Sequence, residues 1–269
     1  MHPLFDLTGR TALITGGAGL LGRRHAEAIA AAGGIPVILD INGERAKAVA
    51  AEVSPQAIGA QVDITDPKQV QSVADSVLSQ FGHIDILINN AANNPTMNSA
   101  SAGSSRFEKF SLQQWEDDLS VGLTGAFICS QIVGTKMAEV KRGVILNIAS
   151  DLAVIAPDQR LYEREGIAEE NQDVKPVTYS VAKHGLLGLT KYLASYFGLK
   201  GIRVNALSPG GIQTPKTDPI LLDRLQKLIP MGRMAREDEY QGAVLLLCSD
   251  ASSYITGHNL IIDGGRCAA

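Results

Sequence analysis

The stretch Thr15-Gly16-Gly17-Ala18-Gly19-Leu20-Leu21-Gly22 decides the fold. It follows an apolar run at 11–15 that predicts a β-strand, and it opens a helical pattern that covers 20–32. Spaced glycines at such a junction permit a tight turn and let a phosphate group approach the backbone N–H groups of the helix N-terminus. Because a plain strand-to-helix turn needs fewer glycines, the pattern indicates a site for a dinucleotide pyrophosphate.

The rest of the chain repeats the same rhythm of strand and helix. Its short runs are apolar nearly throughout rather than alternating, as in parallel strands covered on both faces. Repeated β-α units predict a Rossmann-type α/β fold, a doubly wound parallel sheet with helices on both faces. We expect further strands at 36–40, 57–62, 85–89, 143–148, 203–206 and 259–262, and helices at 44–53, 67–81, 113–139, 177–197 and 237–249.

The composition limits the class of protein. The 269 residues are 45% hydrophobic and 19% charged, which fits a single globular domain over 1–269, and the net charge of −4 argues against a nucleic-acid partner. Neither an apolar run of the ~18 residues that span a bilayer nor a signal peptide is present, so we expect a cytoplasmic protein with no membrane partner. The 3 cysteines and the scattered histidines lack the spacing of a disulfide framework or a metal site, so we expect no metal.

Two aspartates end neighbouring predicted strands. Asp40 lies about twenty residues beyond the glycine turn, where a carboxylate can bind both hydroxyls of an adenosine ribose and repel a 2′-phosphate. This favours NAD(H) over NADP(H), although Arg23 or Arg24 could offset the repulsion if either left the exposed face of its helix. Asp63 is a candidate for binding the adenine amino group or, with equal weight, a loop carboxylate.

The helical stretch at 177–197 carries a tyrosine and a lysine four residues apart. Residues with this spacing share a helix face, so the phenol of Tyr179 and the ammonium of Lys183 can address one point. A nearby ammonium favours the phenolate and lowers the tyrosine pKa. Tyr179 is therefore a candidate general acid or base for interconverting a hydroxyl and a carbonyl group.

Together with three further motifs, the glycine turn and the Tyr179/Lys183 pair resemble the short-chain dehydrogenase/reductase family. These motifs are Asn89-Asn90-Ala91-Ala92, Ser150 after a buried strand, and Ser208-Pro209-Gly210. The resemblance covers 7–265, which is nearly the whole chain. It implies a nicotinamide-dependent oxidoreductase and a homo-oligomer, a tetramer or a dimer.

The resemblance also assigns roles to single residues. It makes Tyr179 the proton donor or acceptor, lets Lys183 bind the nicotinamide ribose and lower the tyrosine pKa, and lets Ser150 hydrogen-bond the substrate oxygen. Asn89 and Asn90 would support the cofactor cleft. The residues expected to bind the cofactor are Gly16, Gly19, Leu20, Leu21, Gly22, Asp40, Asp63, Ile64, Asn90, Ala91, Tyr179, Lys183, Pro209, Gly210, Ile212 and Thr214.

The sequence departs from the family at two positions. Single-domain members show T-G-x-x-x-G-x-G, whereas this turn reads T-G-x-x-G-x-x-G with Leu20 in a glycine position, which is the spacing of the longer sugar-nucleotide-modifying branch. Gly122 stands where the family has an asparagine whose main-chain carbonyl holds a proton-relay water. Since glycine keeps a carbonyl, we expect an active but slower enzyme.

Two segments interrupt the β-α rhythm. Residues 93–105 are small and polar, and 156–176 are charged and separate Ser150 from Tyr179 by more residues than usual. We expect 156–176 to form a flap beside the active site that suits a large or polar substrate, or else to serve subunit contacts. Leucine spacing within 212–236 predicts a short amphipathic helix that acts as a substrate lid.

The leading expectation is an oxidoreductase that transfers a hydride between NAD(H) and a small-molecule alcohol or carbonyl, such as a sugar derivative. The glycine spacing suggests a nucleotide-sugar epimerase or dehydratase as an alternative, but the chain lacks the extra C-terminal domain of those enzymes. Gly122 suggests a catalytically silent NAD-binding sensor, against which the intact Ser150, Tyr179 and Lys183 count.

Overall fold

The 7 strands of the described part of the chain form one parallel sheet, in the order β3-β2-β1-β4-β5-β6-β7. The computed structural model describes residues 2–93 and 103–268. The order reverses between β1 and β4, which is where α/β sheets form a ligand crevice. The strands are β1 (Thr11–Thr15), β2 (Ile35–Asp40), β3 (Ile58–Gln61), β4 (Ile86–Asn89), β5 (Gly143–Ile148), β6 (Ile202–Pro209) and β7 (Asn259–Ile262).

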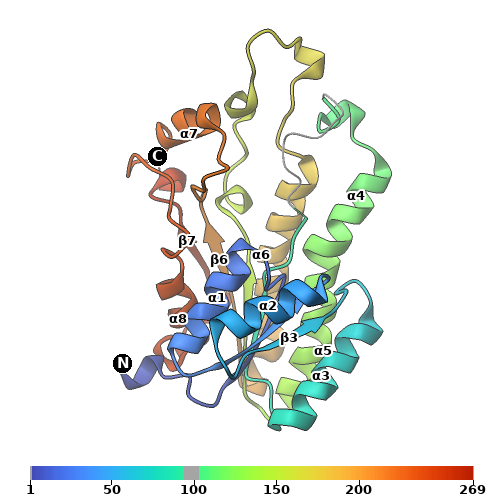
Figure 1. The fold of residues 1–269 in the computed structure, drawn as a ribbon, viewed down its shortest axis with the longest axis vertical. Helices are drawn as coiled ribbons and strands as arrows, with labels where there is room; N and C mark the ends of the chain where they lie inside the picture. The colour runs from blue at the N-terminus through green and yellow to red at the C-terminus, as the bar shows by residue number, and fades with distance from the viewer. Residues whose placement is uncertain (1, 94–102, 269) are drawn as a thin grey trace.

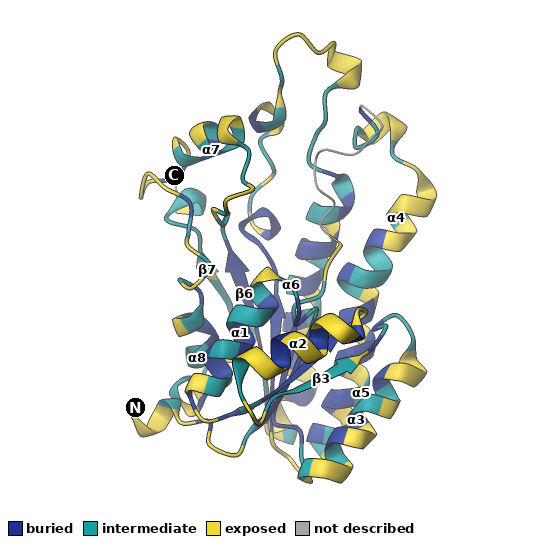
Figure 2. Cartoon of the chain, in the orientation of Figure 1, coloured by how far each residue is buried: buried dark blue, intermediate teal, exposed yellow. Residues whose placement is uncertain are grey.

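Helices cover both faces of the sheet, as predicted for a doubly wound fold. One apolar core lies between the sheet and α1 (Leu20–Ala31), α2 (Gly43–Val53) and α8 (Gln241–Cys248). The other lies between the sheet and α3 (Pro67–Phe81), α5 (Gly125–Glu139) and α6 (Val177–Phe197). Figure 2 shows buried strands in the middle and helices with an exposed outer face. This burial on both faces explains why the strands are continuously apolar.

Several predicted boundaries are confirmed to the residue. The strands expected at 11–15, 143–148 and 259–262 begin and end as predicted, and so do the helices at 67–81 and 177–197. Asp66 caps α3, since its side chain accepts a hydrogen bond from the backbone N–H of Lys68. Proline in the first helical turn and a capping aspartate before it are therefore reliable signals of a helix start.

The helix expected at 113–139 is divided into two. α4 (Leu112–Leu119) is followed by one π-helical turn at Ser120–Thr124, and α5 begins at Gly125. A π turn inserts an extra residue into the helical repeat, so the helix changes direction there. Gly125 permits the close packing at this bend, because a Cβ atom there would lie 2.5 Å from Ile64 Cδ1.

Two other boundaries differ from the prediction by more than one residue. β6 continues to Pro209 rather than ending at 206, because residues 206–209 pair with β7. α8 begins at Gln241 rather than at 237, since residues 237–240 form a turn that buries Tyr240 against the sheet. Neither difference changes the topology.

Segment 156–176 rises beyond the carboxyl ends of the strands, between α7 (Pro219–Gln226) and the region that leads into α4 (Figure 1). Arg224 of α7 donates hydrogen bonds to the carbonyl oxygens of Arg160 (2.9 Å) and Glu163 (2.7 Å). A small apolar cluster joins the same two segments. Its buried members are Leu161, Leu225, Ile229 and Met234.

The other side of segment 156–176 is attached to residues 103–110. Asp173 accepts a hydrogen bond from the backbone N–H of Gly103 at 3.3 Å, and Arg106 donates to the carbonyl oxygen of Glu169 at 2.7 Å. We call the three connected segments, 103–110, 156–176 and 212–236, the canopy. Most of the polar stretch predicted at 93–105 lies outside the described residues. Within the described residues, each helix is too short or too polar to cross a lipid bilayer.

Candidate active site

The glycine turn closes tightly between β1 and α1. Gly16 has φ +58°, and a Cβ atom there would lie 2.9 Å from Ala91 Cα. A Cβ atom on Gly22 would lie 2.3 Å from the carbonyl oxygen of Gly16. Leu20, which replaces a usual glycine, is exposed and leaves the turn open. Among the residues that the structure describes, no side chain caps the first turn of α1, so its N–H groups are available to a phosphate.

Asn90 ties the glycine turn to the end of β4. Its Nδ2 group donates to the carbonyl oxygens of Thr15 (3.0 Å) and Gly16 (3.1 Å). In return, Thr15 Oγ1 accepts the backbone N–H groups of Asn90 and Ala91. The two strand ends are therefore fixed against each other at the point where the strand order reverses.

A pocket of about 200 Å³ opens beside this turn. Asp40 borders it, and the carboxylate accepts backbone N–H bonds from Ala18 (3.2 Å) and Asn42 (3.1 Å). Asp63 also borders it while its carboxylate binds Thr65, so it acts as a loop carboxylate as well. These three features fit a dinucleotide: glycines at positions where a Cβ atom would collide with the turn, uncapped N–H groups on α1, and a pocket lined by carboxylates. The predicted cofactor residues that line this pocket are Gly16, Asp40, Asp63, Ile64 and Ala91.

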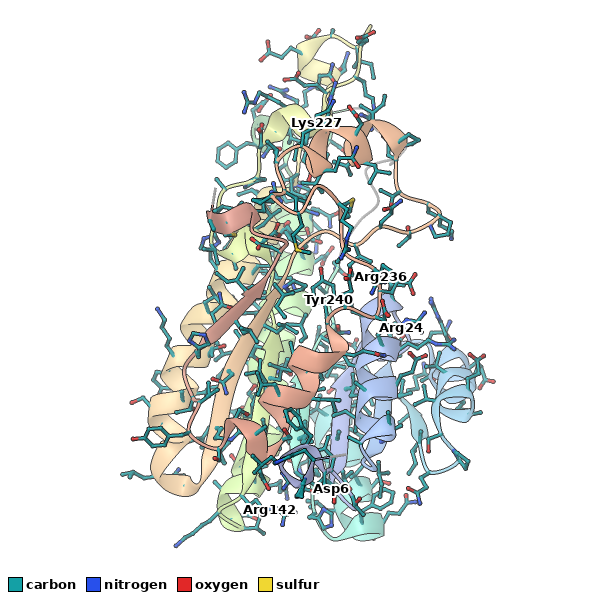
Figure 3. All side chains as sticks on the ribbon, turned by 90° about the vertical axis from the view of Figure 1, so that its left-hand side faces the viewer. Asp6, Arg24, Arg142, Lys227, Arg236 and Tyr240 are labelled. Carbon is teal, nitrogen blue, oxygen red and sulfur yellow. The ribbon has the colours of Figure 1, made fainter. Side chains whose placement is uncertain are left out.

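The two arginines of α1 are held away from this pocket by carboxylates. Arg23 forms ion pairs with Glu27 (3.0 Å) and Glu52 (2.5 Å). Arg24 pairs with Glu27 and with Glu237, both at 2.8 Å. Figure 3 shows Arg24 on the side of the molecule that carries Arg236 and Tyr240. Both guanidinium groups therefore have carboxylate partners in place of a phosphate.

The predicted catalytic residues meet at the carboxyl end of β5. Lys183 is buried, and its ammonium donates a hydrogen bond to the carbonyl oxygen of Ile148 at 2.8 Å. Ser150 is buried two residues beyond β5. Ser150 also forms a side-chain hydrogen bond with Tyr179. The structure thus brings Ser150, Tyr179 and Lys183 together, as the sequence predicts.

Buried amides hold α6 in this position. Asn147 of β5 donates to Thr190 Oγ1 of α6 at 2.8 Å, and Asn89 of β4 donates to Asn147 Oδ1 at 2.8 Å. Buried side-chain networks of this kind fix neighbouring elements because each unmade bond would cost free energy. Asn89 therefore acts below the cleft, and Asn90 acts at its edge.

The expected lowering of the Tyr179 pKa by Lys183 is wrong for this state of the protein. Burial is the largest effect and raises the pKa of Tyr179, and the negative charge of Asp151 raises it further. Lys183 is itself buried, and burial lowers its pKa to about 8, with a contribution from the charge of Lys175. Desolvation by burial is thus the largest effect on the pKa of both groups.

Asp151 and Arg266 are site residues that the sequence did not reveal. Ser150 donates a hydrogen bond to Asp151 Oδ1 at 2.8 Å, and Arg266 pairs with Asp151 Oδ2 at 2.7 Å. Both charged side chains are nearly buried, with 5% and 9% of their surface exposed. A carboxylate directly after Ser150 was a visible signal, but its partner lies 115 residues away in the sequence.

Gly122 lies in the π-helical turn beside the catalytic residues. It borders a small cavity of about 10 Å³, close to the room that one water needs, together with Asp118, Tyr179 and Lys183. Asp118 accepts a hydrogen bond from Thr178 at 2.5 Å and is itself buried. The bend that places α4 against α6 thus persists with glycine at this position.

The remaining predicted residues follow β6. Gly210 binds β7 through the carbonyl oxygen of Ile262 at 2.8 Å, and its own carbonyl accepts the Tyr240 hydroxyl at 3.0 Å. Ile212 pairs with Ala235, which closes the base of 212–236. The other predicted residues in this region are Pro209 and Thr214. Among the described residues, no group of three or more histidine, cysteine or acidic side chains is arranged to hold a metal ion.

Comparisons with known proteins cover almost the whole chain. A family model described as Enoyl-(Acyl carrier protein) reductase matches residues 17–266. The chain is 38% identical to the D-threitol dehydrogenase of Mycolicibacterium smegmatis, over 97% of this chain and 94% of that protein. It is 34% identical to the NAD-dependent glycerol dehydrogenase of Listeria innocua, over 97% and 95% of the two chains.

Solved structures are also similar. A gluconate 5-dehydrogenase from Burkholderia cenocepacia, in complex with NADP and tartrate, has a TM-score of 0.84 at 30% identity and covers 99% of this chain and 98% of that one. A short-chain type dehydrogenase/reductase from Mycobacterium marinum has a TM-score of 0.83 at 32% identity, with 98% and 97% covered.

Proposed function

Because the chain belongs to the short-chain dehydrogenase/reductase family, we propose that it oxidises a polyol or sugar derivative with NAD as the cofactor. It is an oxidoreductase that acts on CH–OH groups with a nicotinamide cofactor. The relatives are dehydrogenases of this kind, and they do not support a nucleotide-sugar epimerase or a silent sensor. The observation that carries the proposal is that Ser150, Tyr179 and Lys183 lie together beside a glycine turn that can accommodate a dinucleotide.

Three side chains divide the chemistry in this proposal. Tyr179 takes the proton of the substrate hydroxyl during oxidation and returns it during reduction. Ser150 holds the substrate oxygen next to the phenol. Lys183 donates one N–H to the carbonyl oxygen of Ile148, so two N–H groups of its ammonium remain to bind the cofactor ribose and other groups in the site. The nicotinamide ring, when bound, accepts or supplies the hydride.

Asp40 and the two paired arginines support NAD over NADP. A 2′-phosphate beside Asp40 would meet a carboxylate, and Arg23 and Arg24 would have to leave their glutamate partners to neutralise it. The related gluconate 5-dehydrogenase is in complex with NADP, so the choice depends on these local residues rather than on the fold.

The canopy supports a polar substrate. We assign 156–176 the role of a flap and 212–236 that of a lid, because both lie beyond the carboxyl ends of the strands and are joined by Arg224. Relatives named for threitol, glycerol and gluconate act on compounds with several hydroxyl groups. The substrate class that fits both observations is a polyol or sugar derivative.

We further infer a homo-oligomer, with α5 and α6 in the interface. Val181, Tyr192 and Tyr196 form one stripe along α6, and Phe127 of neighbouring α5 is exposed as well. Apolar side chains gathered on one helix pair are typical of an interface between subunits. Sedimentation of the purified protein would give a monomer mass if this inference were wrong.

An oxidation assay tests the function directly. The purified protein is incubated with NAD or NADP and a panel of polyols, sugars and simple secondary alcohols, and the reduced nicotinamide is followed by absorbance. We expect turnover of a polyol with NAD, and at least roughly tenfold lower kcat/KM with NADP. Dinucleotide binding without turnover of any alcohol would overturn the proposed function, and a preference for NADP would overturn the cofactor assignment alone.

A further inference from the structure

Segment 156–176 ends in a lysine that the catalytic roles above do not use. The ammonium of Lys175 lies 3.8 Å from the ring centre of Tyr179, nearer than that of Lys183 at 5.8 Å. Lys175 borders the same small cavity as Tyr179, Lys183 and Gly122. Two ammonium groups from different segments therefore address one phenol.

The fold holds Lys175 in place through its main chain. The backbone N–H of Lys175 donates to Gln159 Oε1 at 2.8 Å, which joins the end of the segment to its beginning. The next residue, Pro176, is the N-cap of α6, and its carbonyl accepts the backbone N–H of Tyr179. The side chain of Lys175 thus leaves the backbone directly above the first turn of α6.

We propose that Lys175 is a second electrostatic partner of Tyr179, which stabilises the ionised phenol through the face of its ring. A cation over an aromatic face is attracted to the neutral ring, and the attraction grows when the ring carries a phenolate charge. This inference rests on the proposed function of Tyr179 as the proton acceptor. It gives segment 156–176 a role in the chemistry in addition to covering the cleft.

The charges that surround this pair are compatible with the proposal. Burial lowers the pKa of Lys175 to about 8, and the negative charge of Asp151 works against this change. Asp151 is paired with Arg266, and the carboxylate of Asp118 is bonded to Thr178. The titratable and charged groups around Lys175 and Tyr179 are Asp118, Asp151, Tyr162, Lys183 and Arg266.

The first test needs no substrate. Trace acetylation of the purified protein with acetic anhydride, from about pH 6 to about pH 11, measures the titration midpoint of each lysine by mass spectrometry of its peptide. We expect Lys175 to titrate near the value of about 8 that its burial gives, with the peptide of the exposed Lys68 measured alongside as an internal reference. A midpoint for Lys175 near its ordinary value of 10.5 would show an ammonium exposed to solvent instead of packed on the ring of Tyr179, and would overturn the proposal whether or not a substrate is known.

The second test uses the pH dependence of alcohol oxidation. Lys175→Met removes the charge and keeps the length of the chain, so the midpoint of the rising limb of kcat/KM should move up by about one pH unit, with about tenfold lower activity below it. Lys175→Arg should restore the profile, and Lys68→Met on α3 should leave it unchanged.

The two results separate this proposal from the proposed function. A uniform loss of activity in Lys175→Met with no shift of the midpoint, or a loss that Lys175→Arg does not repair, would show a structural role only and overturn the proposal. If no alcohol is oxidised at all, the proposed function fails, and so does the part of this proposal that concerns Tyr179. A perturbed lysine would then remain from the first test as an independent finding.

Discussion

Two regions at the carboxyl edge of the sheet hold their polar groups in different ways. The glycine turn between β1 and α1 is fixed by backbone groups and by the amide of Asn90, which follows β4. The surroundings of Tyr179 are fixed by charges, with Lys175, Asp151 and Arg266 arriving from three separate segments. The first region is therefore a rigid binding site for a ligand, whereas the charges of the second region determine the ionisation of Tyr179. Variants in each region should fail in different measurements.

The largest effect is expected at the centre of the charged region. Tyr179→Phe removes the hydroxyl that transfers the proton, so kcat should fall by about a thousandfold. Dinucleotide affinity, measured by fluorescence titration, should stay within a few-fold of the wild type, because the glycine turn is untouched. Retained activity would assign the proton transfer to another group.

The ion pair beside Ser150 should matter for stability. Arg266→Gln leaves the nearly buried Asp151 without its partner, which costs about 3–5 kcal/mol in comparable cases. The matched double variant Asp151→Asn/Arg266→Gln replaces the pair by two amides and should recover most of the free energy of unfolding in urea. Equal stability of the single variant and the wild type would contradict the importance of the pair.

The dinucleotide region contains a buried histidine that should respond to acid. Burial lowers the pKa of His25 on α1 to about 4 from 6.5, so between these values the unfolded chain binds more protons than the folded one. The free energy of unfolding should therefore fall as the pH decreases through this window, by about 3 kcal/mol at most.

Unfolding in urea at neutral pH and at about pH 4 measures this effect. His25→Met should remove the pH dependence that His25 contributes, whereas His184→Gln, an exposed control on α6, should keep it. If the free energy of unfolding fell equally with pH in the wild type, His25→Met and His184→Gln, other groups would cause the acid sensitivity.

A methyl group in the glycine turn should weaken cofactor binding. In Gly22→Ala the new Cβ would lie 2.3 Å from the carbonyl oxygen of Gly16, so the turn must open. We expect a cost of about 1–3 kcal/mol, or roughly ten- to a hundredfold in dinucleotide affinity. Gly242→Ala meets no atom within 4 Å and serves as the control, with unchanged affinity. Tight binding by Gly22→Ala would show that the turn is softer than its packing indicates.

The smallest effect is expected at the bend of α4 and α5. Gly122→Asn places a side chain in the small cavity beside Tyr179, and its Cβ would lie 3.3 Å from Ala182 Cβ. We expect a several-fold loss of kcat, about 1 kcal/mol, because the neighbours must shift slightly. Gly122→Ala should lose less. Faster turnover by the asparagine variant would show that glycine limits this enzyme.

The sequence predicts the first region better than the second. The glycines, Asp40 and the helix signals around α1 and α3 are local, so their spacing predicts both the elements and the site. The spacing of Tyr179 and Lys183 indicates that they share a helix face, and the resemblance to the family adds Ser150 to them. The π-helical turn at Gly122 had no local signal, because a single extra residue in a helical pattern leaves the apolar periodicity nearly intact.

The charges near Tyr179 could not be predicted, because they depend on tertiary contacts. Arg266 reaches Asp151 across 115 positions of the sequence, and nothing near either residue indicates the other. The sequence-based expectation for the Tyr179 pKa considered the ammonium of Lys183 and not burial, which is the larger effect in the folded protein. Desolvation is a property of the packed structure, so it appears only when the neighbours are known.

The attachment of α7 to segment 156–176 bears on how this enzyme could be redesigned. Arg224 donates its hydrogen bonds to backbone carbonyl oxygens, which every type of residue has. The attachment therefore does not depend on the side chains of Arg160 and Glu163. Both positions are exposed. A library that randomises these two positions could therefore be screened for new substrates by directed evolution while segment 156–176 stays attached to α7.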